Sequence, residues 1–366
     1  MNDSNNKTKH HFAADGMPTL IGSIPLADHS EALEWIFSFT PEIPLWPQLP
    51  VIRLEGMLLQ FIEKIPGIVS ADDKTWFDIT TEQFSDEMLA FFEDYLLINE
   101  EPERILSSRF AVSRERAAGL YLFKEKLVGN THCKAVKGQI TGPFTLLTGM
   151  MDHEQRAAYY DQTIREMVVK GLAMKAAWQT AFLAELDLPV IIFIDEPALA
   201  GLGSSSFISI SKDDIAADQT EMIDAIHQAG GLAGIHVCAN TDWPLLLSLD
   251  YDILNFDAYG FFDRLITCRD ELLAFLERGS ILAWGIVPTS EAEQIKKESP
   301  ESLAALWEDQ AKQLAGDKFD LPALLKQSLI TPSCGTGALE PEMARRVLEL
   351  TRDVSRILRD KYPDNL

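Results

Sequence analysis

Short apolar runs alternate with longer stretches of helical periodicity along this chain. From the apolar runs we predict eight strands, at residues 19–25, 43–47, 134–140, 190–194, 234–238, 253–257, 281–286 and 329–333. The periodic stretches predict helices near residues 29–39, 54–63, 82–98, 113–127, 154–185, 215–229, 263–278, 302–314 and 341–359. The later strands are apolar at nearly every position, which is typical of a parallel sheet covered on both faces.

The order of these elements indicates the fold class. Strands that alternate with helices eight times predict an α/β protein of the (β/α)8 TIM barrel type. We interpret residues 1–16 as a disordered tail and residues 17–366 as a single catalytic barrel domain. Residues 50–130 are expected to form helical insertions between early strands, with Thr80 and Thr81 as caps of the helix at 82–98.

The composition excludes several classes of function. The chain has 32 Lys and Arg against 56 Asp and Glu, a net charge of −24, which disfavours binding to nucleic acid or to an anionic membrane surface. No apolar run reaches the roughly 18 residues of a membrane-spanning helix, and the first residues lack the apolar core of a signal peptide. We therefore expect a cytoplasmic protein. Four cysteines in 366 residues are too few for a disulfide scaffold.

Three residues suggest a metal site at the ends of two predicted strands. His236 and Cys238 are separated by one residue, so a strand would place both side chains on the same face, and Cys334 follows a later strand. Nitrogen and sulfur ligands of this kind are typical of zinc. The alternative is that His236 and the cysteines are ordinary core residues. Asp257 is a candidate fourth ligand, although an Asp after a strand is commonly a helix cap.

Other polar residues also follow predicted strands. Asp195 and Glu196 come after the strand at 190–194, and Ser23 lies near the end of the first strand. In a barrel of this class, catalytic groups lie at the carboxyl ends of the strands. Cys133 and Cys268 have no comparable neighbours, and we expect both to be structural.

Several short motifs resemble, in the same order, those of the catalytic barrel of cobalamin-independent methionine synthases. The resemblance extends from about residue 18 to residue 360, and the motifs that carry it are Ile21-Gly22-Ser23, Thr141-Gly142-Pro143, Ile194-Asp195-Glu196-Pro197-Ala198-Leu199, His236-x-Cys238 and Cys334-Gly335. The same superfamily includes uroporphyrinogen decarboxylase and zinc-dependent corrinoid methyltransferases.

This resemblance implies a role for each candidate residue. His236, Cys238 and Cys334 would bind zinc, with Asp257 standing where the family has a Glu ligand. For an amino-acid substrate, Ser23 would hold the carboxylate and Asp195 the ammonium group, while Glu196 would bind substrate or orient the site. Bound zinc would turn the thiol of homocysteine into a thiolate that attacks a methyl group, giving methionine.

Two departures from the family pattern bear on the substrates. The family's second ammonium-binding Glu is missing from the segment after strand two, and Glu55 lies farther along. The segment at 285–289 also lacks the His that the family places after strand seven. Methyltetrahydrofolate has an amine leaving group that needs a proton, whereas a methylcorrinoid does not. We therefore expect methylcobalamin or a methylated corrinoid protein as the methyl donor.

Three alternatives stay open at this point. The chain could methylate another thiol, such as coenzyme M, with a corrinoid donor. It could be a decarboxylase of the uroporphyrinogen type, although that substrate calls for arginines near the barrel mouth. It could also be a non-enzymatic accessory protein that binds zinc or a corrinoid.

Overall fold

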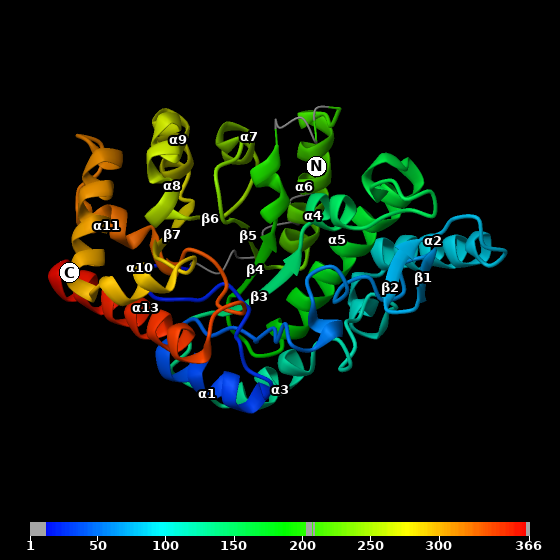
Figure 1. The fold of residues 1–366 in the computed structure, drawn as a ribbon, viewed down its shortest axis with the longest axis horizontal. Helices are drawn as coiled ribbons and strands as arrows, with labels where there is room; N and C mark the ends of the chain where they lie inside the picture. Colours follow the sequence, from blue (N-terminus) through cyan, green and yellow to red (C-terminus); the bar gives the residue numbers. More distant parts are fainter. Residues whose placement is uncertain (1–11, 203–206, 208, 364–366) are drawn as a thin grey trace, which may run out of the picture.

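A curled, six-stranded parallel sheet forms the centre of the molecule (Figure 1). The structure is a computed structural model that describes residues 12–202, 207 and 209–363. The strands pair in the order of the sequence: β3 (Val136–Thr141), β4 (Val190–Asp195), β5 (Leu232–Val237), β6 (Ile253–Phe256), β7 (Ile281–Val287) and β8 (Ser328–Pro332). All six lie within two residues of strands predicted from the sequence. The described chain is thus an α/β protein with a parallel half-barrel.

The first two predicted strands, at residues 19–25 and 43–47, do not form hydrogen-bonded ladders. They make isolated parallel bridges that run from β8 through both segments to β3, namely Pro18 with Ile330, Ser23 with Gln48, and Leu45 with Lys137. Proline has no N–H to donate to a ladder. The second segment contains Pro44 and Pro47 and is flanked by Pro41 and Pro50, which accounts for the missing strand there.

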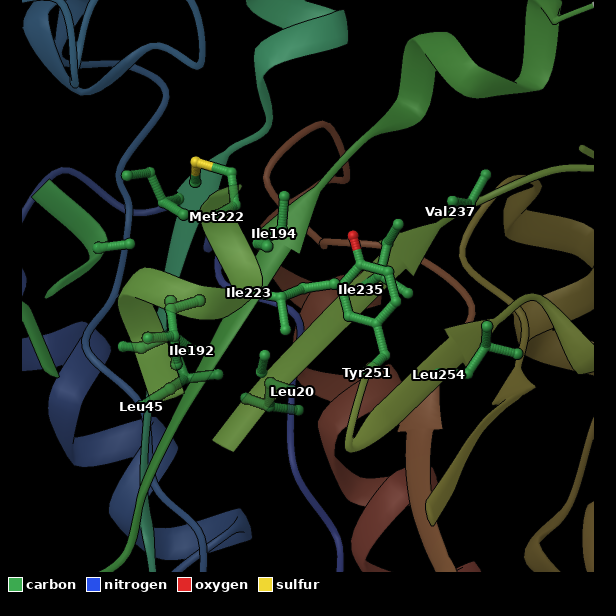
Figure 2. Close-up of a cluster of buried hydrophobic side chains, with 14 of the residues drawn as sticks. Leu20, Leu45, Ile192, Ile194, Met222, Ile223, Ile235, Val237, Tyr251 and Leu254 are labelled. Atoms are coloured by element: carbon green, nitrogen blue, oxygen red, sulfur yellow. The ribbon is translucent and has the colours of Figure 1, made fainter. Parts of the chain in front are cut away.

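The two faces of the sheet contact different neighbours. Alternate residues of β4, Ile192 and Ile194, lie in the large hydrophobic core together with Met222 and Ile223 of α6 (Lys212–Gln228), as Figure 2 shows. The alternating residues Ile191 and Phe193 lie on the opposite face. They belong to a smaller apolar cluster that also contains Ile253, Ala283 and Leu329. Because both faces are buried, the strands are apolar at nearly every position.

Helices cover the convex face of the sheet (Figure 1). They are α1 (His29–Phe39), α3 (Ala118–Leu127), α4 (Pro143–Gly149), α5 (Gln162–Ala184), α6, α7 (Trp243–Ser248), α8 (Ala258–Leu265), α9 (Arg269–Glu277), α10 (Ala292–Lys297), α11 (Pro300–Ala315), α12 (Leu321–Lys326) and α13 (Pro341–Lys361). Short 3-10 turns occur at Ala158–Tyr160, Pro197–Gly201 and Ile266–Cys268, and the last of these divides the helix predicted at 263–278 into α8 and α9. None of the described helices is long and apolar enough to cross a membrane.

The region between residues 50 and 130 is less helical than predicted. The helix expected at 54–63 is a 3-10 turn, Arg53–Glu55, followed by other turns. An antiparallel hairpin of β1 (Ile68–Ala71) and β2 (Lys74–Phe77) precedes α2 (Phe84–Glu100) and a 3-10 segment, Pro102–Ser107. The predicted caps of α2 are also wrong, because Gln83 holds the N-cap position.

The structure describes residues 12–16 of the predicted disordered tail, residues 1–16. Residues 1–11 lie outside the described residues. Residues 12–16 are ordered: the N–H groups of Asp15 and Gly16 donate to the carbonyls of Lys326 and Ser328 at 3.1 and 2.9 Å, and Ala14 is fully buried. The expectation of disorder is therefore wrong for residues 12–16.

Candidate metal centre

His236, Cys238 and Cys334 come together at the carboxyl ends of β5 and β8. Their ligand atoms, one ring nitrogen and two sulfurs, all lie within 4.8 Å of one another. His236 is buried, and both cysteines are partly buried. The spacing along β5 and the turn after β8 thus produce one group of three soft ligands, of which Cys238 and Cys334 are 96 positions apart in the sequence.

The ring of His236 is oriented by Asn255 on the neighbouring strand. Asn255 Nδ2 donates to the carbonyl of Ala283 at 2.9 Å and to Thr331 Oγ1 at 2.8 Å, so its Oδ1 is the atom that faces His236 Nδ1. An amide oxygen only accepts hydrogen bonds, so this network assigns the proton of the neutral ring to Nδ1. Nε2 therefore keeps its lone pair. Burial lowers the pKa of His236 to about 4, which favours this neutral form.

The two cysteines influence each other's ionisation. A hydrogen bond with Cys334 lowers the pKa of Cys238 to about 7, although burial opposes this shift. The same hydrogen bond and burial raise the pKa of Cys334. Two cysteine sulfurs next to a neutral imidazole are well suited to bind a soft divalent cation, which displaces the thiol protons.

Glycines in the turn after β8 allow Ser23 to lie beside Cys334. A Cβ at Gly335 would lie 2.2 Å from Ser23 Oγ, and one at Gly337 would lie 2.8 Å from Ser23 Cβ. The backbone N–H of Gly337 donates to Ser23 Oγ at 3.1 Å. The turn and the first extended segment are thereby joined, and the hydroxyl proton of Ser23 is left to donate elsewhere.

A cavity of about 320 Å³ opens next to the three ligands. Its volume lies within the usual range for small-molecule sites. The lining contains two carboxylates, from Glu55 and Asp195, and among the described residues it includes no Lys or Arg. The residues that line it are Ile21, Ser23, Gln48, Pro50, Glu55, Gly56, Met57, Asp195, Pro197, His236, Cys238, Cys334, Gly335, Gly337 and Ala338.

Asp195 ends β4 on the cavity side. It is only 5% exposed, and its Oδ1 has no hydrogen-bond partner among the described residues. Burial raises the pKa of Asp195 to about 7, the positive charge of Lys137 opposes this shift, and Cys238 adds to it. A buried carboxylate oxygen without a partner favours a ligand that brings a hydrogen-bond donor.

Glu55 is a cavity residue for which the sequence analysis assigned no role. Its Oε1 lies 2.7 Å from His29 Nε2, and its Oε2 accepts from the backbone N–H of Leu49 at 2.8 Å. No motif marks Glu55 in the sequence. Only its position after the second extended segment could have indicated that it reaches the carboxyl end of the sheet.

Glu196, predicted to bind substrate or to orient the site, forms its hydrogen bonds with residues of α4 and α6. Its carboxylate accepts from the N–H groups of Phe144 and Thr145 at 3.0 and 2.7 Å, from Thr145 Oγ1 at 2.6 Å and from Gln219 Nε2 at 2.6 Å. A Cβ at Gly142 would lie 2.2 Å from this carboxylate, which explains the glycine of the Thr-Gly-Pro motif. Burial raises the pKa of Glu196 to about 7, and the four donors oppose that shift. Glu196 connects β4 to α4 and α6 and does not line the cavity.

Asp257, the weaker candidate ligand, caps α8. Its Oδ1 accepts from the backbone N–H of Gly260 at 2.7 Å, and it is not part of the group of three ligands. Burial raises the pKa of Asp257 to about 6. The sequence left two interpretations of Asp257 open, a metal ligand and a helix cap. Its contacts in the structure are those of a helix cap.

The segment that follows β7 contributes no acidic side chain to the cavity lining. Thr289 is buried, and its hydroxyl shares a hydrogen bond of 2.9 Å with that of Ser333. The N–H of Ser333 donates to the carbonyl of Val287 at 2.8 Å. The segment after β7 therefore packs against β8 and contributes no residue to the cavity lining.

Comparison with known proteins supports the fold. A B12-independent methionine synthase from Shewanella sp. W3-18-1, solved in complex with selenomethionine, aligns over 94% of this chain and 98% of its own, with a TM-score of 0.56 and 15% identity. A module of a pneumococcal exo-β-D-N-acetylglucosaminidase aligns over 93% of this chain and 85% of its own at a TM-score of 0.42 and 9% identity, too distant to support an inference. No protein-family profile and no curated protein matches the chain. Of the predicted relationship to methionine synthases, these comparisons support the fold alone.

Proposed function

We propose that this chain is a zinc-dependent S-methyltransferase whose acceptor is an amino-acid thiol, homocysteine, with methionine as the product. The observation that carries the proposal is the position of the His236, Cys238 and Cys334 group at the wall of a cavity whose lining, in the part of the chain that the structure describes, has two carboxylates and no Lys or Arg. The fold shared with a methionine synthase is consistent with it.

The chemical type of the three ligands and the orientation of the His236 ring both suit zinc. One imidazole and two sulfurs form a donor set that catalytic zinc sites use, and it leaves a coordination position for a substrate. His236 also has the hydrogen-bonded Nδ1–H that zinc-binding histidines usually have. When bound, zinc supplies Lewis acidity that favours the deprotonated form of a thiol at neutral pH.

The charges in the cavity favour a thiol that carries an ammonium group. Asp195 and Glu55 offer negative charge to such a group, and a charge-assisted hydrogen bond is roughly twice as strong as a neutral one. The Ser23 hydroxyl can donate to the substrate carboxylate. Coenzyme M carries a sulfonate and uroporphyrinogen carries several carboxylates, so both would meet like charge without a basic partner. This lining therefore favours homocysteine over either rival.

The methyl donor is best explained as a methylcorrinoid. In the transfer, the thiol sulfur uses its electron pair to form the new bond to carbon, the carbon–cobalt bond breaks with its pair left on cobalt(I), and the thiol proton is released to solvent. No protein group has to protonate the leaving cobalt. Methyltetrahydrofolate would need a proton on its leaving amine, and the segment after β7 contributes no residue to the cavity lining.

Methyl transfer by the purified, zinc-loaded protein tests this proposal. Methylcobalamin and methyltetrahydrofolate serve as donors, and homocysteine, coenzyme M and 4-mercaptobutyrate, which lacks the amino group, serve as acceptors. We expect turnover with methylcobalamin and homocysteine, and much less with the other two thiols. Turnover with methyltetrahydrofolate alone would overturn the assignment of the donor. Zinc binding without turnover on any thiol would favour the non-enzymatic accessory protein.

A further inference from the structure

A fully buried lysine lies within the sheet that supports the cavity. Lys137 of β3 shares the face of Gln139 and Thr141, and the register places it beside Ile191 of β4. It does not line the cavity. An ammonium group is costly to bury unless it has hydrogen-bond acceptors or a counter-charge, so the contacts of Lys137 indicate what retains it there.

The ammonium group of Lys137 contacts two segments that both end at the cavity. Its Nζ donates to the carbonyl of Ile21 at 2.6 Å, two residues before Ser23. The same Nζ lies 4.2 Å from the ring centroid of Phe193, two residues before Asp195 on the same face of β4. One side chain therefore contacts the supports of both residues that are proposed to hold the amino acid, Ser23 and Asp195.

Charge links Lys137 to Asp195 as well. Burial lowers the pKa of Lys137 to about 7, and the negative charge of Asp195 raises it. In return, Lys137 lowers the pKa of Asp195 against the effect of burial. Asp195 lines the cavity and Lys137 does not, so a ligand contacts the carboxylate and not the ammonium group.

We propose that Lys137 is a positioning residue of the acceptor subsite: through its contacts with Ile21 and Phe193 it holds the Ile21–Ser23 segment and the Asp195 end of β4 in place for a ligand's carboxylate and α-ammonium groups. This inference rests on the proposed function. Lys137 acts through Asp195 and Ser23 and does not touch the substrate. Its loss should therefore weaken recognition of the amino group and leave zinc binding intact.

Binding of two thioethers to the zinc-loaded protein tests this role without turnover. Methionine carries the α-ammonium group, and 4-(methylthio)butyrate is the same molecule without it. By isothermal titration calorimetry, we expect Lys137→Met to weaken methionine binding by about ten-fold more than the binding of 4-(methylthio)butyrate, the scale of one charge-assisted hydrogen bond. In an Asp195→Asn background the same substitution should no longer weaken methionine binding more than the binding of 4-(methylthio)butyrate.

The matched control is Lys175→Met, which removes another fully buried lysine, in α5, remote from the cavity lining. It should change the binding of neither thioether. Zinc content and melting temperature are measured for every variant. If Lys137→Met does not fold, Lys137→Arg keeps the charge and should retain the preference for methionine, whereas a preference lost with the charge still present overturns the inference.

Two further results would overturn the role of Lys137: equal weakening of both thioethers in Lys137→Met, or a methionine-specific weakening that persists in the Asp195→Asn background. Failure of the proposed function appears differently, as wild-type protein that transfers no methyl group to any thiol. Methionine binding that depends on Lys137 can be observed independently of that result.

Discussion

The Nδ1 atom of His236 is hydrogen-bonded to Oδ1 of Asn255, its register partner on the next strand. The contact joins β5 to β6 just beneath the three candidate ligands. Because the two amide hydrogens of Asn255 are already used by Ala283 and Thr331, the contact determines which ring nitrogen of His236 can bind a metal.

Replacing Asn255 with leucine should weaken zinc binding without removing a ligand. The substitution keeps the approximate volume of the side chain but leaves Nδ1–H without an acceptor, and changes of this kind typically cost about 10- to 100-fold in metal affinity. Competition with a chromophoric chelator measures the affinity. Thr331→Val, which removes only one acceptor of the Asn255 amide, should have a smaller effect. Unchanged affinity in Asn255→Leu would mean that the ring needs no such support.

Glu196→Gln should destabilise the fold. A glutamine would turn its NH2 group either toward the donors of Phe144 and Gln219 or toward those of Thr145, and an unsatisfied buried network of this kind costs about 2–4 kcal/mol. Urea denaturation measures the free energy of unfolding. The exposed Glu293→Gln serves as the matched control and should change it by less than about 0.5 kcal/mol. An equally small change in Glu196→Gln would contradict the structural role.

Asp257→Ala distinguishes a helix cap from a metal ligand. Loss of the hydrogen bond to the Gly260 N–H should cost about 0.5–2 kcal/mol of stability, while the zinc content stays at the wild-type level. Asp257→Ser, which can still cap α8, should recover most of the stability. A fall in zinc content in both variants would instead identify Asp257 as a ligand.

Lys175→Met should change the pH dependence of stability. Lys175 Nζ has no hydrogen-bond partner among the described residues, and burial lowers the pKa of Lys175 from 10.5 to about 7. Between these values the unfolded chain binds more protons than the folded chain, so this lysine makes the wild type gain stability as pH rises. The methionine variant should be the more stable protein at about pH 7, with an advantage that shrinks toward about pH 10.

Urea denaturation at several pH values measures that difference. Lys296→Met, at an exposed position, controls for the general loss of a positive charge. A difference between Lys175→Met and wild type that stays constant over the whole range would show that Lys175 does not titrate with a lowered pKa.

The later strands and the three soft ligands could be predicted from the sequence because each depends on local information. Full burial of a parallel sheet produces uninterrupted apolar runs, and a one-residue spacer places His236 and Cys238 on one face. The second strand was predicted wrongly because apolar content outweighed the prolines at 41–50, and the first makes only isolated bridges. Glu55 and Lys137 carried no signal, since their environment depends on segments distant in the sequence.

Glu196 shows why a shared motif does not assign a role. It follows Asp195 directly, but successive side chains at the end of a strand point to opposite sides, so one faces the cavity and the other faces α4 and α6. The sequence showed both carboxylates at the end of the strand. Only the packing of α4 and α6 determines which of them a ligand can contact.

The zinc content of purified wild-type protein and of Cys334→Ala tests the central claim most directly, with Cys268→Ala as the control. Cys268 lies in the 3-10 turn between α8 and α9, outside the group of three ligands. We predict about one zinc ion per chain in wild type and in Cys268→Ala, and a small fraction of that in Cys334→Ala. Full zinc occupancy in Cys334→Ala, or no zinc in the wild type after incubation with the metal, would contradict the metal centre on which the proposed chemistry depends.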